Sequence, residues 1–586
     1  MVMIGDKQYL DVLAEYSKNK HDMKIALIGH STLTRAVDEL YFAFRIRGIN
    51  PEIRLGGYNT CVQDILNEGS WLYEYKPDLL ILLADAKRIT PQDFDIEYFR
   101  MKPNDYQMVL SDIENVFDSF VATIKNRLEN TIVIVCNTVV PTNTILGIAE
   151  LKCDTSYTSL IQEFNRVLRN HLFFQRDVFL FDLDSLASKY GKDALVSPVA
   201  QVLGDLAFSH NFLLDLGRVL ASFYLSIKKG GKKCIVLDLD NTLWHGIVGE
   251  EEMNVKMGSE QVGKPYHEFQ HLLLGMYNRG ILLVINSKNN FDDAMKIITG
   301  HPDEILRKEH FAAMRINWQD KASNMIELSN ELSLGLDSFV FFDDNPTERN
   351  LIKQMCPQVT VVDSYSDAGA IFDFIAFLKK STVFDIPKLT DEDLERGKMY
   401  HEQLERQTFE QKVSLDEYLK SLKLQITITE LSDVNFDRVH ELISKTNQFN
   451  LTTIRYTPMA LKGILKSTGN RVYIAKAKDR FGTYGIIGTI IMKEDLNRTW
   501  RIDSFLMSCR IIGKGIETAI LKFVIDKAKE LNFNIISGVY IPTAKNSVVA
   551  NLYKEHGFVQ NSKGTWLLDV HNNSVDYPTW IMVTED

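Results

Sequence analysis

The sequence predicts a multidomain α/β protein, on the basis of three observations. The chain has 586 residues, enough for about three or four domains, and 45% of them are hydrophobic, enough for several cores. Apolar strands alternate with amphipathic helices as far as residue 385, a pattern typical of βαβ units with parallel sheets. From about residue 425 the pattern changes to strands around two helices, which indicates a mixed α/β domain.

The first predicted domain covers residues 1–228. Lys24–Ile28, Leu79–Leu83 and Ile132–Cys136 are short apolar runs, and we expect them as central strands of a parallel sheet. Ser31 follows the first of these strands where it leads into a helix. A serine at this point can cap the helix or serve as a nucleophile if a base lies nearby.

The central domain begins after Lys228–Lys233, a polar and flexible linker. Its first apolar strand, which starts at Cys234, ends in Asp238 and Asp240, and Thr242 follows. Two carboxylates at a strand end can hold Mg²⁺, and one of them can attack an electrophile. The simpler alternative is a strand that ends in solvated acids.

Three further polar clusters follow in the central domain, each at a strand end or a helix start. Ser287 ends a second apolar strand, Lys321 opens an amphipathic helix, and Asp343 with Asp344 ends a third strand. Because ligands bind at the carboxyl ends of parallel strands, we expect these side chains to converge near Asp238. Few residues lie between Asp238 and Ser287, so a large inserted cap is not expected.

The segment 386–424 is charge-rich and helical in pattern, and we expect it to bridge to the last domain. There a strand runs through Arg501–Cys509 into a loop that contains Arg510, Gly513 and Gly515, and a helix begins at Ile516. An R-x-x-G-x-G loop between a strand and a helix presents backbone amides to a pyrophosphate. The alternative is a tight turn that uses glycines.

The four clusters of the central domain together resemble the HAD superfamily, whose members transfer phosphoryl groups through an aspartate. The chain resembles the FkbH-type proteins most closely, over residues 23 to about 580. The motifs are D-L-D-N-T-L-W at 238–244, N-W-x-x-K-A-x-N at 317–324, F-x-D-D-N-P-x-E-R at 341–349 and T-N-Q-F-N-L-T-T at 446–453. FkbH-type proteins are linked to the synthesis of glyceryl-carrier-protein thioesters from 1,3-bisphosphoglycerate.

The resemblance implies a fold for each part of the chain. Residues 1–228 are expected to form a flavodoxin-like, SGNH-hydrolase-like domain, and residues 229–385 a Rossmannoid HAD core. Residues 386–424 are expected as a helical linker and 425–586 as a mixed α/β domain of the GNAT acyltransferase type.

The resemblance also implies roles for the residues of the HAD core. Asp238 would be the nucleophile, Asp240 the general acid and base, and Ser287 and Lys321 would contact the phosphoryl oxygens. A surface position on its helix is the alternative for Lys321. The remaining expectations are Mg²⁺ bound by Asp238, Asp240, Asp343 and Asp344, and substrate binding by Thr242, Asn289, Asn345 and Arg349.

In the GNAT-like part, the resemblance implies a site for coenzyme A or the phosphopantetheine arm of a carrier protein. The residues expected to form it are Arg510, Gly513, Gly515, Asn546 and Tyr553. In the first domain, Ser31 would occupy the SGNH nucleophile position. The nearest partners, Asp205 and His210, have the wrong spacing for the family's D-x-x-H block, so we favour a helix cap and a binding or docking module.

One departure from the family pattern concerns the acceptor. FkbH-type proteins commonly have a cysteine before the motif serine, and that cysteine can carry the glyceryl group as a thioester. Here the position is Asn286, and an amide cannot serve as that nucleophile. Cys509, beside the GNAT-like loop, could act as a relay, although a buried packing role is commoner for such a cysteine.

Composition limits the other function classes. The net charge of −11 disfavours nucleic acid or anionic membranes as the main partner. The six cysteines form no CxxC pair, which indicates reduced thiols in the cytoplasm and no zinc site. The N-terminus lacks a signal-peptide pattern, and no apolar run is long enough for a membrane span.

We therefore predict an enzyme that takes a glyceryl group from 1,3-bisphosphoglycerate, releases phosphate with Mg²⁺, and loads an acyl carrier protein. The sequence contains no carrier-like segment, so the carrier would act in trans. The alternative is a HAD and GNAT acyltransferase that modifies a sugar or an amine in polysaccharide, polyketide or other secondary-metabolite biosynthesis. A non-enzymatic scaffold is disfavoured by the intact set of HAD residues.

Overall fold

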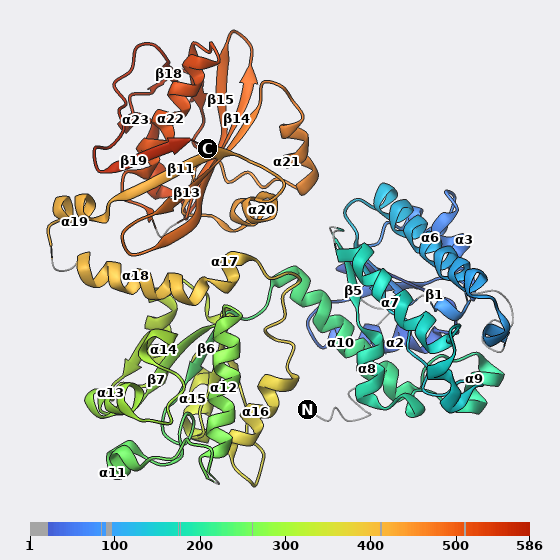
Figure 1. Ribbon diagram of the computed structural model, residues 1–586. Coiled ribbons are helices and arrows are strands. Elements are labelled where there is room, and N and C mark those ends of the chain that lie inside the picture. Colours follow the sequence, from blue (N-terminus) through green and yellow to red (C-terminus); the bar gives the residue numbers. More distant parts are fainter. Residues whose placement is uncertain are drawn as a thin grey trace. The chain divides into compact units, whose positions relative to one another are not determined.

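The computed structural model describes residues 21–83, 85–88, 97–173, 175, 177–260, 262–410, 413–508 and 511–585. The chain divides into two compact units (Figure 1). The first unit comprises residues 1–231 with 381–388, and the second comprises 232–380 with 389–586. Together they contain two parallel sheets and one mixed sheet, which confirms the predicted multidomain α/β class.

The sheet of the first unit has five parallel strands in the order β2-β1-β3-β4-β5. This is the flavodoxin-like order, as predicted. Side chains alternate between the two faces, so Ile25 and Leu27 belong to one hydrophobic core while Ala26 and Ile28 belong to another. The strands are β1 (Met23–Gly29), β2 (Pro51–Leu55), β3 (Leu79–Leu83), β4 (Ile132–Cys136) and β5 (Val178–Phe181).

Helices cover both faces of this sheet. The core on the Ile25 face includes residues of α2 and α10, and the core on the Ala26 face includes residues of α6 and α7. The α-helices of the unit are α2 (Thr34–Arg45), α3 (Cys61–Leu66), α4 (Trp71–Tyr75), α6 (Pro103–Arg127), α7 (Tyr157–Phe173), α8 (Leu183–Tyr190), α9 (Pro198–Gly204) and α10 (His210–Lys229).

The region around Ser31 differs from both expectations for that residue. The N-cap position of α2 is Leu33, so Ser31 does not cap this helix. Asp205 accepts a hydrogen bond from Tyr58 (2.6 Å) and pairs with Arg88. His210 pairs with the buried Glu39 at 2.9 Å. Both potential triad partners therefore have other charged or polar partners.

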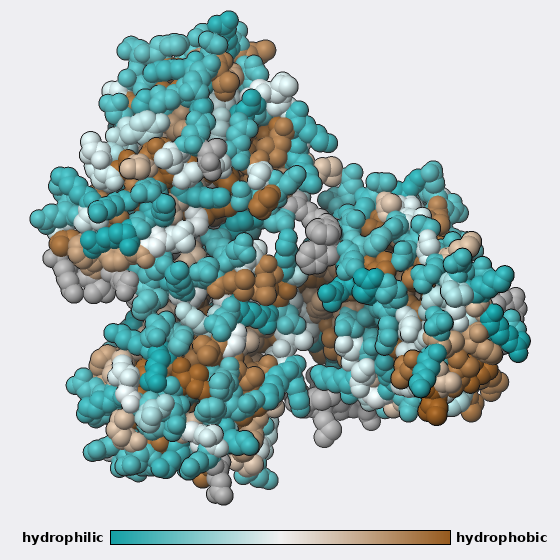
Figure 2. Space-filling view, viewed as in Figure 1, coloured by the Kyte–Doolittle hydropathy of each residue, from teal (hydrophilic) through white to brown (hydrophobic). Residues whose placement is uncertain are grey.

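The surface of the first unit carries an apolar area over α9 (Figure 2). Val199, Val202 and Leu203 of this short helix are 67%, 80% and 83% exposed. Exposed apolar clusters are typical of interaction sites, in keeping with a docking role for this unit.

The second unit begins with a five-stranded parallel sheet in the order β10-β9-β6-β7-β8. The central strand β6 has β7 and β9 as its neighbours. The strands are β6 (Cys234–Leu237), β7 (Leu282–Ser287), β8 (Phe311–Ile316), β9 (Phe339–Phe342) and β10 (Thr360–Val361), and the α-helices are α11 (Val248–Glu251), α12 (Lys264–Asn278), α13 (Phe291–Gly300), α14 (Lys321–Glu331), α15 (Pro346–Met355) and α16 (Ala370–Lys380).

Three helices connect this sheet to the last one: α17 (Asp391–Leu394), α18 (Arg396–Glu410) and α19 (Leu415–Leu422). Helix α18 forms hydrogen bonds with the part that contains the five-stranded sheet and with the part that contains the last sheet. Its Tyr400 donates to the carbonyl of Leu332 at the end of α14 (3.0 Å). Its buried Arg406 forms two hydrogen bonds, of 2.8 and 3.0 Å, with Asp479 beyond β13. One helix thus fixes the two parts of the unit together.

The last sheet has nine strands and is mixed: β15 and β16 are parallel, whereas β13, β14 and β15 are antiparallel. The strands are β11 (Leu424–Glu430), β12 (Phe449–Asn450), β13 (Arg471–Lys478), β14 (Thr483–Asp495), β15 (Thr499–Met507), β16 (Ile535–Gly538), β17 (Val559–Gln560), β18 (Trp566–Asp569) and β19 (Ile581–Glu585), and the α-helices are α20 (Phe436–Lys445), α21 (Pro458–Leu465), α22 (Ile516–Glu530) and α23 (Leu552–Glu555).

In the described part of the chain, no helix has the length and apolar composition needed to span a membrane.

A buried carboxyl supports the first sheet of the second unit. Gln270 of α12 donates to the carbonyl of Leu243 (3.0 Å) and to Glu304 (3.2 Å), and it accepts from the backbone of Ile305 and Leu306. Glu304 is 3% exposed. Burial raises its pKa from 4.5 to about 8, against a smaller opposing effect of the hydrogen bond from Gln270.

We expect Glu304→Gln to stabilise the protein at pH 8 and to have little effect at pH 4.5. The folded state keeps Glu304 protonated, whereas the unfolded chain ionises near pH 4.5, so this stability is complete below pH 4.5 and is lost as the pH rises to 8. Each pKa unit is worth about 1.4 kcal/mol, so the loss is on the order of 4 kcal/mol. Thermal unfolding of the wild type and of Glu304→Gln at both pH values measures this difference in stability, with the exposed Glu309→Gln as control. An equal shift at both values would contradict this account.

Candidate active site

The four predicted clusters of the HAD-like part converge at the carboxyl end of its sheet. Asp238 directly follows β6, Ser287 ends β7, Lys321 begins α14 after β8, and Asp343 follows β9. The Lys321 ammonium lies 2.8 Å from Asp238 and 2.6 Å from Asp343. The strand order therefore assembles a cluster from residues more than 100 positions apart in the chain.

Lys321 is 2% exposed, so it is not a surface lysine. Burial by itself lowers the pKa of its ammonium, but the carboxylates of Asp238 and Asp343 outweigh this effect and raise the pKa to about 12. Lys321 is therefore a fixed positive charge beside Asp238. Such a charge stabilises the carboxylate and any phosphoryl group transferred to it.

The acids of the site fit a divalent cation. Carboxylate oxygens of Asp238, Asp343 and Asp344 all lie within 4.8 Å of one another. Burial, and then the charge of Asp238, raise the pKa of Asp343 to about 7 and that of Asp344 to about 6. Three acids this close repel one another, and Lys321 neutralises only part of their charge. Oxygen ligands in this arrangement match the preference of Mg²⁺.

Asp240 is oriented by three hydrogen bonds. One carboxylate oxygen accepts from the indole of Trp244 (2.9 Å) and from the backbone of Val248 (3.1 Å). The other accepts from the amide of Asn289 at 2.9 Å. Burial, opposed in part by these bonds and reinforced by Asp238, raises the pKa of Asp240. An oriented carboxyl whose pKa is raised suits proton transfer.

The residues predicted to bind substrate have other contacts in the structure. Asn289 holds Asp240. Asn345 caps α15 by accepting from Thr347 at 2.9 Å. Arg349 donates to the carbonyls of Asp343 and Asp344, each at 2.7 Å. Asn289 and Arg349 thus contact the acids of the site, Asn345 fixes the start of the helix that follows them, and substrate binding by the three stays a prediction.

Ser287 and Thr242 are buried at the same sheet end, with 2% and 0% exposure. The hydroxyl of Thr242 has no hydrogen-bond partner among the described residues. The backbone of Asn317 donates to the carbonyl of Ser287 at 3.1 Å, which fixes the end of β7. Of the four predicted substrate contacts, Thr242 has a buried hydroxyl that remains unpaired among the described residues.

Asn286, which stands where the family commonly has cysteine, is fully buried. Its amide donates to the carbonyl of Lys321 (2.9 Å) and accepts from Asn324 (3.1 Å), which also contacts Asn317. These three asparagines fix the start of α14 and hence the position of Lys321. Sequence reasoning missed this role, although Asn317 and Asn324 are the two ends of the N-W-x-x-K-A-x-N motif.

Of the residues predicted to bind coenzyme A or phosphopantetheine, Gly513, Gly515, Asn546 and Tyr553 lie in the part of the chain that forms the last sheet and its helices, away from the Asp238 cluster. Gly513 and Gly515 both have φ of 82° and lie directly before α22, as a pyrophosphate loop requires. Tyr553 is 1% exposed, and its hydroxyl has no partner in the described part of the chain. Asn546 is fully buried and donates to two backbone carbonyls, each at 2.9 Å. Arg510 and Cys509 lie outside the described residues.

Comparisons with known families match two separate parts of the chain. A model described as "FkbH, N-terminal domain" matches residues 24–221, and one described as "Acetyltransferase (GNAT) family" matches residues 436–558. A crystal structure of the N-terminal part of the protein BF1531 from Bacteroides fragilis, "containing phosphatase domain complexed with Mg", covers 65% of this chain and 99% of its own. The sequences are 25% identical and the TM-score is 0.56.

The chain contains an FkbH N-terminal domain, a phosphatase-type domain and an acetyltransferase-type domain. Two GNAT structures each cover 25% of this chain. They are the ribosomal-protein-S18-alanine N-acetyltransferase of Escherichia coli (11% identity, TM-score 0.20, 94% of that chain) and a Vibrio cholerae spermidine N-acetyltransferase in complex with CoA and spermine (16%, 0.21, 99%). A search of curated proteins gave no match.

Removal of one acid from the cluster should have opposite effects with and without Mg²⁺. We expect Asp344→Asn to raise the melting temperature of the metal-free protein, because it removes one of three mutually repelling charges. The same change should abolish most of the stabilisation by Mg²⁺, which in the wild type grows with the concentration of free Mg²⁺. Thermal unfolding across a Mg²⁺ titration measures both effects. Asp367→Asn, an exposed acid outside the cluster, is the control, and a full Mg²⁺ response in Asp344→Asn would contradict the metal assignment.

The indole of Trp244 should matter for turnover and not for binding. Trp244→Phe keeps the buried ring but removes one donor to Asp240, and a hydrogen bond to a charged group is worth about 1.5–3 kcal/mol. We expect kcat for p-nitrophenyl phosphate to fall at least about tenfold, with KM nearly unchanged. Trp71→Phe removes a comparable indole bond, to Asp64 (2.9 Å), in the other unit and should leave kcat unaltered. A rise in KM at constant kcat would instead make Trp244 a substrate-binding residue.

Proposed function

We propose that the protein is a glyceryltransferase coupled to a phosphatase. It takes the glyceryl group of 1,3-bisphosphoglycerate, releases phosphate at the Asp238 site, and loads the group on the thiol of an acyl carrier protein. The observation that supports this most is the position of Lys321, buried between Asp238 and Asp343 at 2.8 and 2.6 Å. A carboxylate with a fixed cation beside it is equipped to accept a phosphoryl group.

The phosphoryl chemistry takes two steps. An oxygen of Asp238 attacks phosphorus, the bond to the leaving oxygen breaks, and Asp240 gives that oxygen a proton. Asp240 then takes a proton from water, which attacks the aspartyl-phosphate, and phosphate leaves with Asp238 restored. Lys321 and Ser287 hold the phosphoryl oxygens through both steps.

Mg²⁺ fits the remaining charge of the site. Asp238, Asp343, Asp344 and the backbone carbonyl of Asp240 would hold it, and when bound it neutralises charge on the phosphoryl oxygens. The phosphatase domain of BF1531, which was crystallised with Mg, supports this assignment.

The acceptor thiol comes from another molecule in this proposal. Asn286 is an amide and is held in a buried network, so it cannot carry the acyl group. The thioester would form when a carrier thiol attacks the acyl-phosphate carbon and phosphate leaves. The remaining phosphate monoester would be hydrolysed at Asp238. We assign residues 229–385 to the phosphoryl chemistry, 425–586 to the carrier arm and 1–228 to docking, with 386–424 as linker.

Intact-mass spectrometry of a phosphopantetheinylated carrier protein tests the proposal. The carrier would be incubated with the enzyme, Mg²⁺ and 1,3-bisphosphoglycerate generated in place. We expect a glyceryl-sized mass gain with the wild type and its loss in Asp238→Asn, because no aspartyl-phosphate can form. Asp337→Asn, an exposed acid, should retain the gain.

Phosphate release with no mass gain on several carriers would overturn the carrier as acceptor. It would favour the alternative acyltransferase, which modifies a sugar or an amine in polysaccharide or secondary-metabolite biosynthesis. Wild-type phosphate release in Asp238→Asn would refute the nucleophile itself.

A further inference from the structure

One edge of β15 leads directly to the glycine loop of the last sheet. Strand β14 pairs with β15 along its whole length, from Thr499 to Met507. On the opposite edge β16 pairs only with Thr499–Ile502. The second half of that edge is therefore left open by β16, and it runs into the loop that carries Gly513 and Gly515.

An open strand edge beside such a loop suits a phosphopantetheine arm. The arm is an extended chain with a phosphate at one end, two amide groups along it and a thiol at the other end. With its phosphate on the loop amides, the arm would lie along β15, and its amides could pair with the strand edge as a peptide does.

In the structure this edge is already occupied by β12. Phe449 pairs with Met507 and Asn450 with Leu506, and the backbone of Leu451 donates to Phe505 at 3.1 Å. Because β14 covers the other edge, β12 must lie on the edge that β16 leaves open. The ring of Phe449, which is 3% exposed, packs edge-on against Phe505 with centroids 5.4 Å apart.

The far side of β12 is bonded as well. The carbonyl of Leu451 accepts from the backbone of Ile541 (2.9 Å), and the carbonyl of Asn450 accepts from the amide of Asn546 (2.9 Å). Residues 449–451 therefore fill the gap between β15 and the segment after β16. We propose that this three-residue segment, the β12 plug, closes the site for a phosphopantetheine arm and must leave before an arm can enter.

The chain after the plug is strained, as expected of a segment with two states. Thr453 has φ of 51°, a conformation that is unfavourable for a β-branched residue. The side chain of Asn450 holds this turn by accepting from the backbone of Thr453 (2.8 Å) and Thr452 (3.3 Å). Departure of the plug would break these bonds and release the strain.

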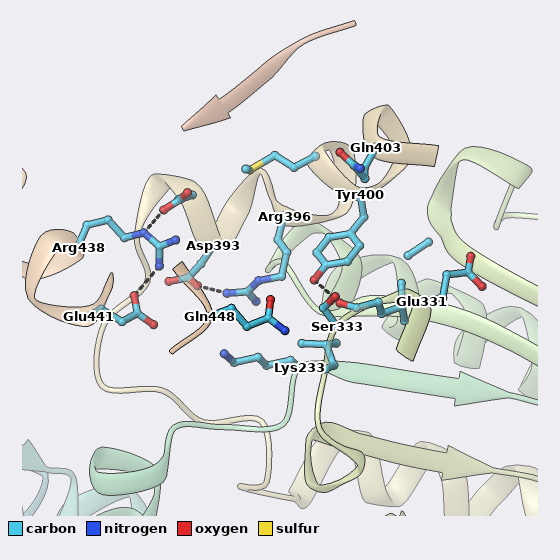
Figure 3. Close-up of a pocket in the computed structure, with 15 residues that line it drawn as sticks. Lys233, Glu331, Ser333, Asp393, Arg396, Tyr400, Gln403, Arg438, Glu441 and Gln448 are labelled. Atoms are coloured by element: carbon cyan, nitrogen blue, oxygen red, sulfur yellow. Dashed lines mark hydrogen bonds and ion pairs between the residues drawn. The ribbon is translucent and has the colours of Figure 1, made fainter. Parts of the chain in front are cut away.

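The chain before the plug has room to move. Gln448 lines a cavity of about 490 Å³, and Figure 3 shows its side chain between those of Arg396 and Lys233. Other polar side chains around this cavity are bonded to one another, as Arg438 is to Glu441 at 2.7 Å. A displaced Gln448 could shift into this space without entering a packed core.

Asn546 gives a test in which the two interpretations predict opposite signs. If its amide contacts the arm, as the sequence suggested, Asn546→Ala should weaken binding of coenzyme A. If the amide holds the plug, the same change should tighten binding. We expect at least a tenfold lower Kd by isothermal titration for Asn546→Ala and for Phe449→Ala. Leu461→Ala, a fully buried leucine in a different core, should show no change.

Hydrogen exchange of the wild-type chain provides a second measurement that needs no variant. Saturating coenzyme A should accelerate exchange of the Leu451 amide, which is bonded to Phe505 in the closed state. Apo- and phosphopantetheinylated carrier proteins, compared in the same assay, separate a free cofactor from a carrier as the source of the arm. If a carrier protein supplies the arm, only the phosphopantetheinylated carrier should accelerate exchange of the Leu451 amide.

The β12 plug rests on the proposed use of a phosphopantetheine arm. The experiments must therefore distinguish failure of the plug from failure of the proposed function. Equal affinity in wild type and both variants, no binding in any of them, or a Leu451 amide that stays protected with ligand bound would overturn the plug. Phosphate release from p-nitrophenyl phosphate, measured in parallel, reports only on the Asp238 site. If the wild type releases no phosphate from p-nitrophenyl phosphate, the phosphatase assignment is refuted, whereas the inference about the plug is unaffected.

Discussion

The contact on which the candidate active site depends is the buried triad of Lys321, Asp238 and Asp343. Each of these charges is costly to bury alone, and Lys321 offsets the cost for both acids by pairing with each of them. The triad joins β6, β9 and α14, so it requires the parallel order of the sheet to be correct. It also leaves net negative charge at the sheet end, since one ammonium faces three carboxylates. That excess is what a divalent cation or the electropositive phosphorus of a substrate can relieve.

Much of this arrangement could be predicted from the sequence, because its signals are local. Apolar strands that end in acids, a serine and a lysine report both the strands and their polar ends, and a parallel sheet brings such ends together. The mixed character of the last sheet was predictable for the same reason, whereas the flavodoxin-like order of the first sheet was implied by the family resemblance. Whether Asn289, Asn345 and Arg349 contact the substrate or only support the site stays a prediction, because a polar side chain near a site has the same sequence signal in both cases.

Asparagine is the residue for which this ambiguity is greatest. Its amide both donates and accepts, so it can satisfy two backbone groups at once and fix a loop. Asn286 does this for the start of α14, and Asn546 does it for the segment after β16. In both cases the family resemblance had implied a position that takes part in chemistry or ligand binding. A buried amide that is fully hydrogen-bonded is unavailable to a substrate until its backbone partners move.

Helix α18 links the two halves of the second unit. It is bonded to Leu332 at the end of α14 through Tyr400 and to Asp479 of the last sheet's region through Arg406, and at the Asp238 site the polar groups are held by hydrogen bonds and ion pairs. Beside the loop that carries Gly513 and Gly515, the open edge of β15 is covered by the β12 plug. The turn at Thr453 follows the plug, and the cavity lined by Gln448 lies before it. Because the phosphoryl site and the proposed arm site are built from different residues, substrate and carrier need not arrive together. Phosphate chemistry can proceed at Asp238 while the thiol site stays shut, and an acyl phosphate is then protected from unintended thiols until a carrier arm displaces β12.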